Sequence, residues 1–171
     1  MRRGGKGFTF FAIAALILFS ACATGPKPGY FVNKSPEFNV SYPEDWISAD
    51  LTNETEVLRV KKAVGLPVIT STVRTITKDY VLAKDAPEGL VDALKLLGGD
   101  QIQVISKKDT KLIDGTAAYE SIVKWNHPML PGLVSMSLAA IKGDKVVSVT
   151  LTTKGMVSEE LKKIPYSLSF K

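Results

Sequence analysis

The sequence has only one cysteine and one histidine among its 171 residues, and these shortages exclude several kinds of site. A lone cysteine, Cys22, cannot form an intrachain disulfide or a cysteine-based zinc site. Any catalytic triad or metal site that needs a histidine must use His127. We therefore expect an apolar core to hold the fold together, and we assign no catalytic residue, metal ligand or dissociable cofactor.

The chain also lacks a strong excess of charge of one sign, with 22 basic and 17 acidic residues and a formal net charge of +5. Three of the basic residues, Arg2, Arg3 and Lys6, precede the first apolar run, which leaves 19 basic against 17 acidic residues. No dense basic patch with interleaved aromatic residues is present, so we expect no nucleic-acid partner.

No apolar run is long enough to cross a membrane as a helix, because the longest covers residues 8–19 and a span needs about 20 residues. A basic start followed by a short apolar run is typical of a secretory signal. Because the positive end stays in the cytoplasm, the part that follows is exported. We interpret residues 1–21 as a signal peptide.

The end of this segment, Ser20, Ala21 and Cys22, resembles the lipobox of bacterial lipoproteins, although Phe19 stands where that family usually has leucine. The resemblance implies cleavage between Ala21 and Cys22 and a diacylglyceryl group on the Cys22 sulfur. Ala23, rather than aspartate, follows and implies the outer membrane, facing the periplasm; a monoderm host would place the domain outside its single membrane. The alternatives are an ordinary secretory cleavage and an uncleaved anchor.

The rest of the chain predicts a flexible tether over residues 22–35 and one domain over residues 36–171, a usual size for a single domain. Alternating and β-branched patterns predict strands, and Asp85, with Glu88 three residues later, predicts the start of a helix that Gly98 ends. Ser158 is expected to cap a closing helix. The expected strands cover 38–42, 56–61, 68–77, 101–106, 111–113, 116–125, 133–141 and 145–152. Several hairpins, one across Asp114 and Gly115, favour an antiparallel α+β fold.

The phrase from Phe38 to Trp46, Phe-Asn-Val-Ser-Tyr-Pro-Glu-Asp-Trp, resembles the opening of the PsbP-like family, whose pattern is F-x-V-x-Y-P-x-x-W. The Tyr119-bearing strand and the ending Ser167–Phe170 also fit. The resemblance implies a central antiparallel sheet flanked by helices, a PsbP-like α-β-α sandwich. It also implies a binding or assembly role rather than an enzymatic one. No residue here matches a motif for manganese, calcium or Ran binding.

The other candidate functional residues favour a contact surface over a catalytic site. His127, Met129 and Leu130 lie in a segment, residues 126–132, that we predict to be a loop between two strands, where apolar residues can meet a partner. Trp46 is interpreted as packing over a strand end, or alternatively as a ligand platform. We expect a membrane-anchored, non-catalytic binding or assembly module with a protein partner or an apolar ligand. The alternatives are a hydrolase with a dispersed site and a structural envelope lipoprotein.

Overall fold

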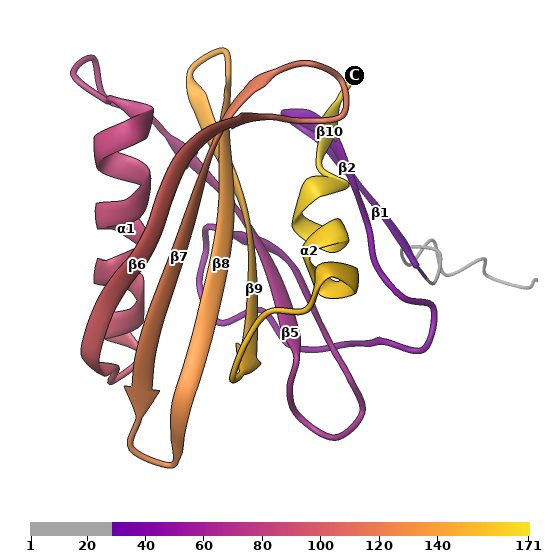
Figure 1. The fold of residues 1–171 in the computed structure, drawn as a ribbon. Helices are drawn as coiled ribbons and strands as arrows, with labels where there is room; N and C mark the ends of the chain where they lie inside the picture. Colours follow the sequence, from indigo (N-terminus) through magenta and orange to yellow (C-terminus); the bar gives the residue numbers. More distant parts are fainter. Residues whose placement is uncertain (1–28) are drawn as a thin grey trace, which may run out of the picture.

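The computed structural model describes residues 29–171, and the predicted signal peptide, the lipobox and Cys22 lie outside the described residues. Within these residues, ten strands and two helices follow one another (Figure 1). They are β1 (Tyr30–Lys34), β2 (Glu37–Ser41), β3 (Ile47–Ser48), β4 (Glu56–Lys61), β5 (Val68–Thr75), α1 (Leu82–Leu96), β6 (Asp100–Lys111), β7 (Ala117–His127), β8 (Leu130–Lys142), β9 (Lys145–Lys154), α2 (Glu159–Tyr166) and β10 (Ser169–Phe170).

The strands form two antiparallel sheets. The large sheet has the order β3-β4-β5-β9-β8-β7-β6, and the small sheet has the order β1-β2-β10. Hairpins join β6 to β7, β7 to β8 and β8 to β9, so neighbours in the chain are neighbours in the sheet. Within the described residues the large sheet therefore ends at β6 on one side and at the very short β3 on the other.

The two faces of the large sheet carry separate apolar clusters. Along β8, Leu138 and Ala140 belong to the larger cluster and Leu133 to the smaller one. Even and odd positions of a strand point to opposite faces, so the clusters lie on opposite sides of the sheet. Figure 1 shows the small sheet and α2 on one side of the large sheet and α1 on the other. The small sheet and α2 therefore cover the larger cluster, whereas Leu90 and Leu94 of α1 belong to the smaller one.

The predicted antiparallel α+β class is confirmed, but "flanked by helices" overstates the part that helices play. One face is covered as much by the small sheet as by the eight residues of α2. The small sheet forms because Phe38, Val40 and Phe170 are buried among the side chains of the large sheet. None of the helices in residues 29–171 is long and apolar enough to cross a membrane.

The first helix begins three residues before the predicted cap. Val81 occupies the N-cap position, and its N–H donates to the carboxylate of Asp85, which lies in the first turn of α1. The acidic residue therefore satisfies a free N–H of the helix start, but from inside the helix. The predicted end is confirmed, since Gly98 has a φ of +80°, a conformation that glycine adopts without strain.

The structure places the residues around two predicted loop segments differently from the expectation. Residues 30–34, assigned to the tether, form β1, which pairs with β2 from Tyr30–Ser41 to Lys34–Glu37. The predicted loop over residues 126–132 is a tight turn, because His127 pairs with Leu130 and only two residues connect the strands. The Oδ1 atom of Asn126 accepts a 2.7 Å hydrogen bond from the N–H of Gly132 and holds the strand ends together.

Candidate binding groove

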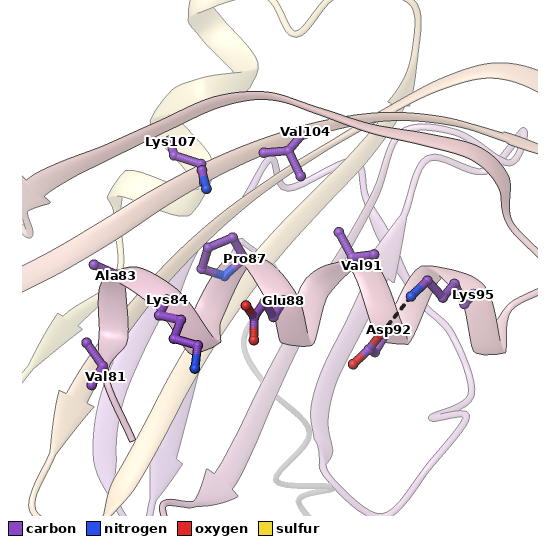
Figure 2. Close-up of a pocket in the computed structure, with 10 residues that line it drawn as sticks. All are labelled: Val81, Ala83, Lys84, Pro87, Glu88, Val91, Asp92, Lys95, Val104 and Lys107. Carbon is purple, nitrogen blue, oxygen red and sulfur yellow. Dashed lines mark hydrogen bonds and ion pairs between the residues drawn. The ribbon is translucent and has the colours of Figure 1, made fainter. Parts of the chain in front are cut away.

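A groove of about 610 Å³ lies between α1 and β6 (Figure 2). Figure 2 shows the helix along one side and two residues of β6, Val104 and Lys107, on the other. The groove combines apolar and charged side chains. The lining residues are Val81, Ala83, Lys84, Pro87, Glu88, Val91, Asp92, Lys95, Val104 and Lys107.

The packing of α1 determines which of its faces reaches the groove. Leu90 and Leu94 are buried against the sheet, together with Trp125 of β7. Val91 lies next to this stripe and is only partly buried, so it serves both the smaller cluster and the groove. Val104 pairs with Val123, which also belongs to the smaller cluster, and this register places Val104 on the α1 side of the sheet.

The groove runs beside an unpaired sheet edge. β6 is twelve residues long and is the last strand of the large sheet, so its outer N–H and C=O groups have no strand partner in residues 29–171. Irregularities in the pairing lie between Asp100 and Gln103 and between Val104 and Ser106. Such bulges blunt an edge against accidental pairing, whereas a straight stretch can receive an extended segment of another chain.

The charges of the groove are mixed, with two lysines and one glutamate, Glu88, outside any ion pair of the described residues. Asp92 and Lys95 form an exposed ion pair at 3.1 Å. Within the part of the chain that the structure describes, Lys84 and Lys107 take part in no ion pair. The arrangement suits a segment that brings apolar side chains to Val91 and Val104 and an acidic group to these lysines.

A second, smaller cavity of about 380 Å³ lies on the opposite face, between the sheet and α2. Its central residue is Glu120 of β7, whose side chain is 4% exposed. The Tyr166 hydroxyl donates a 2.7 Å hydrogen bond to Glu120 Oε2, and Lys108 Nζ lies 3.2 Å from Oε1. The hydrogen bond and charge of Glu120 raise the pKa of Lys108. Both oxygens of Glu120 are thus occupied, so the cluster attaches α2 to the sheet.

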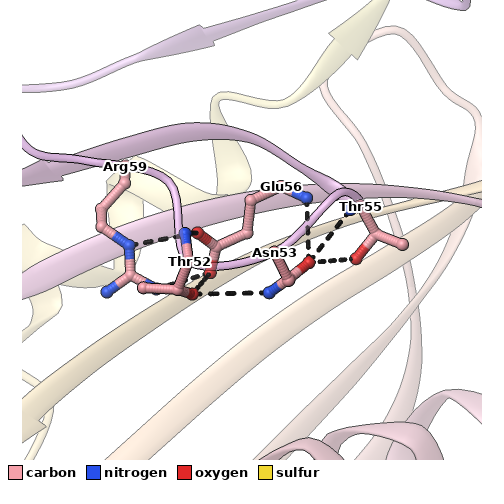
Figure 3. Close-up of polar contacts among 5 residues, drawn as sticks. All are labelled: Thr52, Asn53, Thr55, Glu56 and Arg59. Carbon is pink, nitrogen blue, oxygen red and sulfur yellow. Dashed lines mark hydrogen bonds and ion pairs between the residues drawn. The ribbon is translucent and has the colours of Figure 1, made fainter.

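Another polar cluster holds together the loop that precedes β4 (Figure 3). Arg59 donates from Nε to Glu56 Oε2 at 3.1 Å and from Nη2 to Oε1 at 2.5 Å. Thr52 donates its N–H to Oε2 at 2.8 Å and its hydroxyl to Oε1 at 3.0 Å. Burial alone would raise the pKa of Glu56, but the hydrogen bonds and charge of these partners hold that pKa below its ordinary value. The carboxylate is therefore committed to the loop.

The predicted contact residues do not form one surface. His127, Met129 and Leu130 lie together at the β7–β8 turn, where the side chain of Met129 is 80% exposed. Nδ1 of His127 accepts a 3.2 Å hydrogen bond from the N–H of Met129, and its ring lies edge-on to Trp125. The contact role of this turn stays a prediction.

Trp46 does not share that surface, because it is only 5% exposed and belongs to the larger apolar cluster. The backbone N–H of Trp46 donates a 3.0 Å hydrogen bond to the carbonyl oxygen of Pro43. The turn that this bond closes folds the chain back, so that the indole joins the core. The packing interpretation of Trp46 is the one that agrees with its burial. In residues 29–171 no three His, Cys, Asp or Glu side chains gather in an arrangement that could hold a metal ion.

The residues of the groove were not singled out by sequence reasoning. The alternation of residues 101–106 predicts a strand, and Val91 is part of the predicted helix stripe. Neither pattern tells which strand ends the sheet. The polar run from Ser106 to Lys111, which forms the second half of β6, is the one sequence signal that could have indicated an edge strand.

Comparison with known proteins identifies the fold. No family model and no curated protein matches the sequence, but solved structures do. The cyanobacterial PsbP, CyanoP, of Synechocystis sp. PCC 6803 matches with a TM-score of 0.65 and 13% identity, over 90% of this chain and 99% of that one. The Saccharomyces cerevisiae Ran-binding protein Mog1p matches with a TM-score of 0.53 and 13% identity, over 78% of this chain and 79% of that one. The described domain therefore has a PsbP-like fold, as the sequence resemblance implied.

Proposed function

We propose that this chain is a lipoprotein, lipidated at Cys22 and held at a membrane, whose domain is a non-catalytic binding module. The sequence from Arg2 to Cys22 supports the anchor, and Ala23 supports an outer-membrane location facing the periplasm. A fold shared with PsbP and with a Ran-binding protein supports a binding or assembly role.

The observation that carries the binding proposal is the groove beside β6, a strand whose outer edge has no partner in residues 29–171. A segment added to the regular stretch of β6, from Ser106 to Lys111, would gain main-chain hydrogen bonds from the edge, and its continuation over the groove would contact Val91 and Val104. Lys84 and Lys107 favour an acidic residue in that segment. The proposed ligand is therefore an extended, partly acidic stretch of a partner protein.

The test is site-specific photo-crosslinking in intact cells. A photoreactive amino acid replaces Val104 in the groove and, as the matched control, Ile113, an exposed aliphatic residue of the β6–β7 turn. We expect a discrete adduct from position 104 and not from position 113. Peptide mapping should place the crosslink in an extended segment of the partner.

A second measurement checks the mode of binding. Amides on the outer edge of β6 should exchange with solvent in the free protein and become protected when the mapped peptide is added. Equal adducts from positions 104 and 113, or none from 104 with intact protein in the membrane, would contradict the proposal. The second of these results would leave the structural envelope lipoprotein as the better account.

The hydrolase alternative gains no support from the one histidine. Within residues 29–171, the side chain of His127 contacts the N–H of Met129 and the ring of Trp125, and neither is a nucleophile or a carboxylate. A histidine-dependent triad would need both within hydrogen-bond reach.

A further inference from the structure

The start of the described chain is attached firmly to the domain. The carbonyl oxygen of Gly29 accepts a 3.0 Å hydrogen bond from the N–H of Tyr42, and β1 begins at the next residue. The ladder with β2 continues to Lys34. Any chain that leaves Gly29 toward Cys22 therefore starts from a fixed point on the small sheet.

The distance from Cys22 to Gly29 is limited by chain length. Seven residues span at most about 25 Å when fully extended. A domain of this size has a radius of gyration of about 14 Å, and so a width larger than the tether can reach. If Cys22 carries the lipid, β1 and its surroundings are held next to the membrane surface.

The side chains of β1 on its outer face suit such a position. Phe31 points inward and packs against Phe38, with ring centroids 6.0 Å apart. Tyr30 and Val32 point the other way and remain 40% and 43% exposed. An aromatic residue with a polar tip beside an aliphatic one is a combination that favours the boundary between lipid and water.

The charges around this face largely balance. Lys34 pairs in register with Glu37, and Lys171 forms a 3.5 Å ion pair with the same carboxylate. Glu44 lies beside Gly29 in the exposed turn after β2. Attraction to lipid must therefore come from apolar contact rather than from charge, and it should be insensitive to anionic lipid.

We propose that Tyr30 and Val32 lie in the interface of a phospholipid bilayer and fix the orientation of the tethered domain. This inference rests on the proposed lipid at Cys22. β1 belongs to the small sheet, which covers the face of the large sheet opposite α1, so the domain would present the α1–β6 groove away from the membrane (Figure 1). The groove would then be open to a partner in the aqueous space.

The single cysteine makes a direct test available. In the lipidated chain the Cys22 sulfur is a thioether, so Val32→Cys introduces the only free thiol. Met129→Cys, at the exposed β7–β8 turn, is the control. Each lipidated variant is labelled with a polarity-sensitive fluorophore and reconstituted in vesicles of phosphatidylethanolamine alone or with phosphatidylglycerol.

The label at position 32 should be blue-shifted and quenched several-fold less by aqueous iodide than the label at 129, in both kinds of vesicle. Equal quenching at the two positions in anchored protein would overturn the orientation. Protection only with phosphatidylglycerol would overturn the apolar mode of contact. The parent chain should take up no thiol label, and labelling of the parent would instead overturn the lipid on Cys22.

Discussion

The hydroxyl of Tyr166, near the end of α2, donates a 2.7 Å hydrogen bond to Glu120, a buried carboxylate in the middle of β7. Tyr166→Phe removes this donor and leaves Oε2 without its partner. The free energy of unfolding should fall by about 1–3 kcal/mol, because an unsatisfied buried acceptor keeps its full desolvation cost. Urea unfolding measures the change.

The control for that variant lies on the same helix. Lys163 is exposed, and Lys163→Ala should change stability by less than about 0.5 kcal/mol. Equal effects of the two substitutions would show that the contact between Tyr166 and Glu120 does not stabilise the fold.

Stability should decrease in acid because of Glu56. Its pKa is lower in the folded protein than its ordinary value of 4.5, so the unfolded chain takes up the proton at a higher pH than the folded protein does. The stabilisation is therefore complete above that ordinary value and is lost as pH falls through the lower folded pKa.

The variant Glu56→Gln checks the source of this dependence by urea unfolding between neutral pH and pH 3. It should be less stable at neutral pH by about 1–3 kcal/mol and should lose less stability in acid than the parent. Some dependence will remain, because the pKa of Asp114 is also lowered. An unchanged acid slope would contradict the role assigned to Glu56.

Two glycines, Gly89 inside α1 and Gly99 just after its end, should respond oppositely to substitution by alanine. A Cβ on Gly99 would meet the carbonyl oxygen of Leu94 at 2.7 Å and the ring of Trp125 at 2.8 Å, whereas one on Gly89 would meet only the end of Arg74 at 3.7 Å. Gly99→Ala should destabilise by about 1–3 kcal/mol. Gly89→Ala should stabilise by about 0.5–1 kcal/mol, since alanine favours a helix interior.

Both substitutions change the unfolded chain alike, so the difference between their denaturation midpoints reports the folded state. Shifts in the same direction would contradict the placement of Gly99 against Trp125.

Local sequence patterns were enough to predict several helices and strands of the fold. The strand predicted over residues 56–61 coincides with β4. Ser158 caps α2 as predicted, because its hydroxyl oxygen accepts a 3.3 Å hydrogen bond from the N–H of Leu161. Alternation and capping act within a few residues, so one sequence suffices to recognise them.

Features that depend on pairing between distant parts of the chain could not be predicted from local patterns. β1 follows a stretch rich in glycine and proline, and the third strand of its sheet, β10, comes from the opposite end of the chain. The groove exists because β6 is the edge of the sheet, which follows from the order of all seven strands. The residues of β6 alone therefore do not reveal that this strand is an edge, and the residues of β1 alone do not reveal which strands it joins.

The anchor at Cys22 is the claim on which the membrane role and the orientation of the groove depend. Intact-mass measurement of the native protein extracted from membranes tests it most directly. The account predicts a chain that begins at Cys22 and carries the added mass of a diacylglyceryl group, with or without a further acyl chain on the amine. A chain that still contains residues 1–21, or one with an unmodified Cys22 thiol, would contradict it.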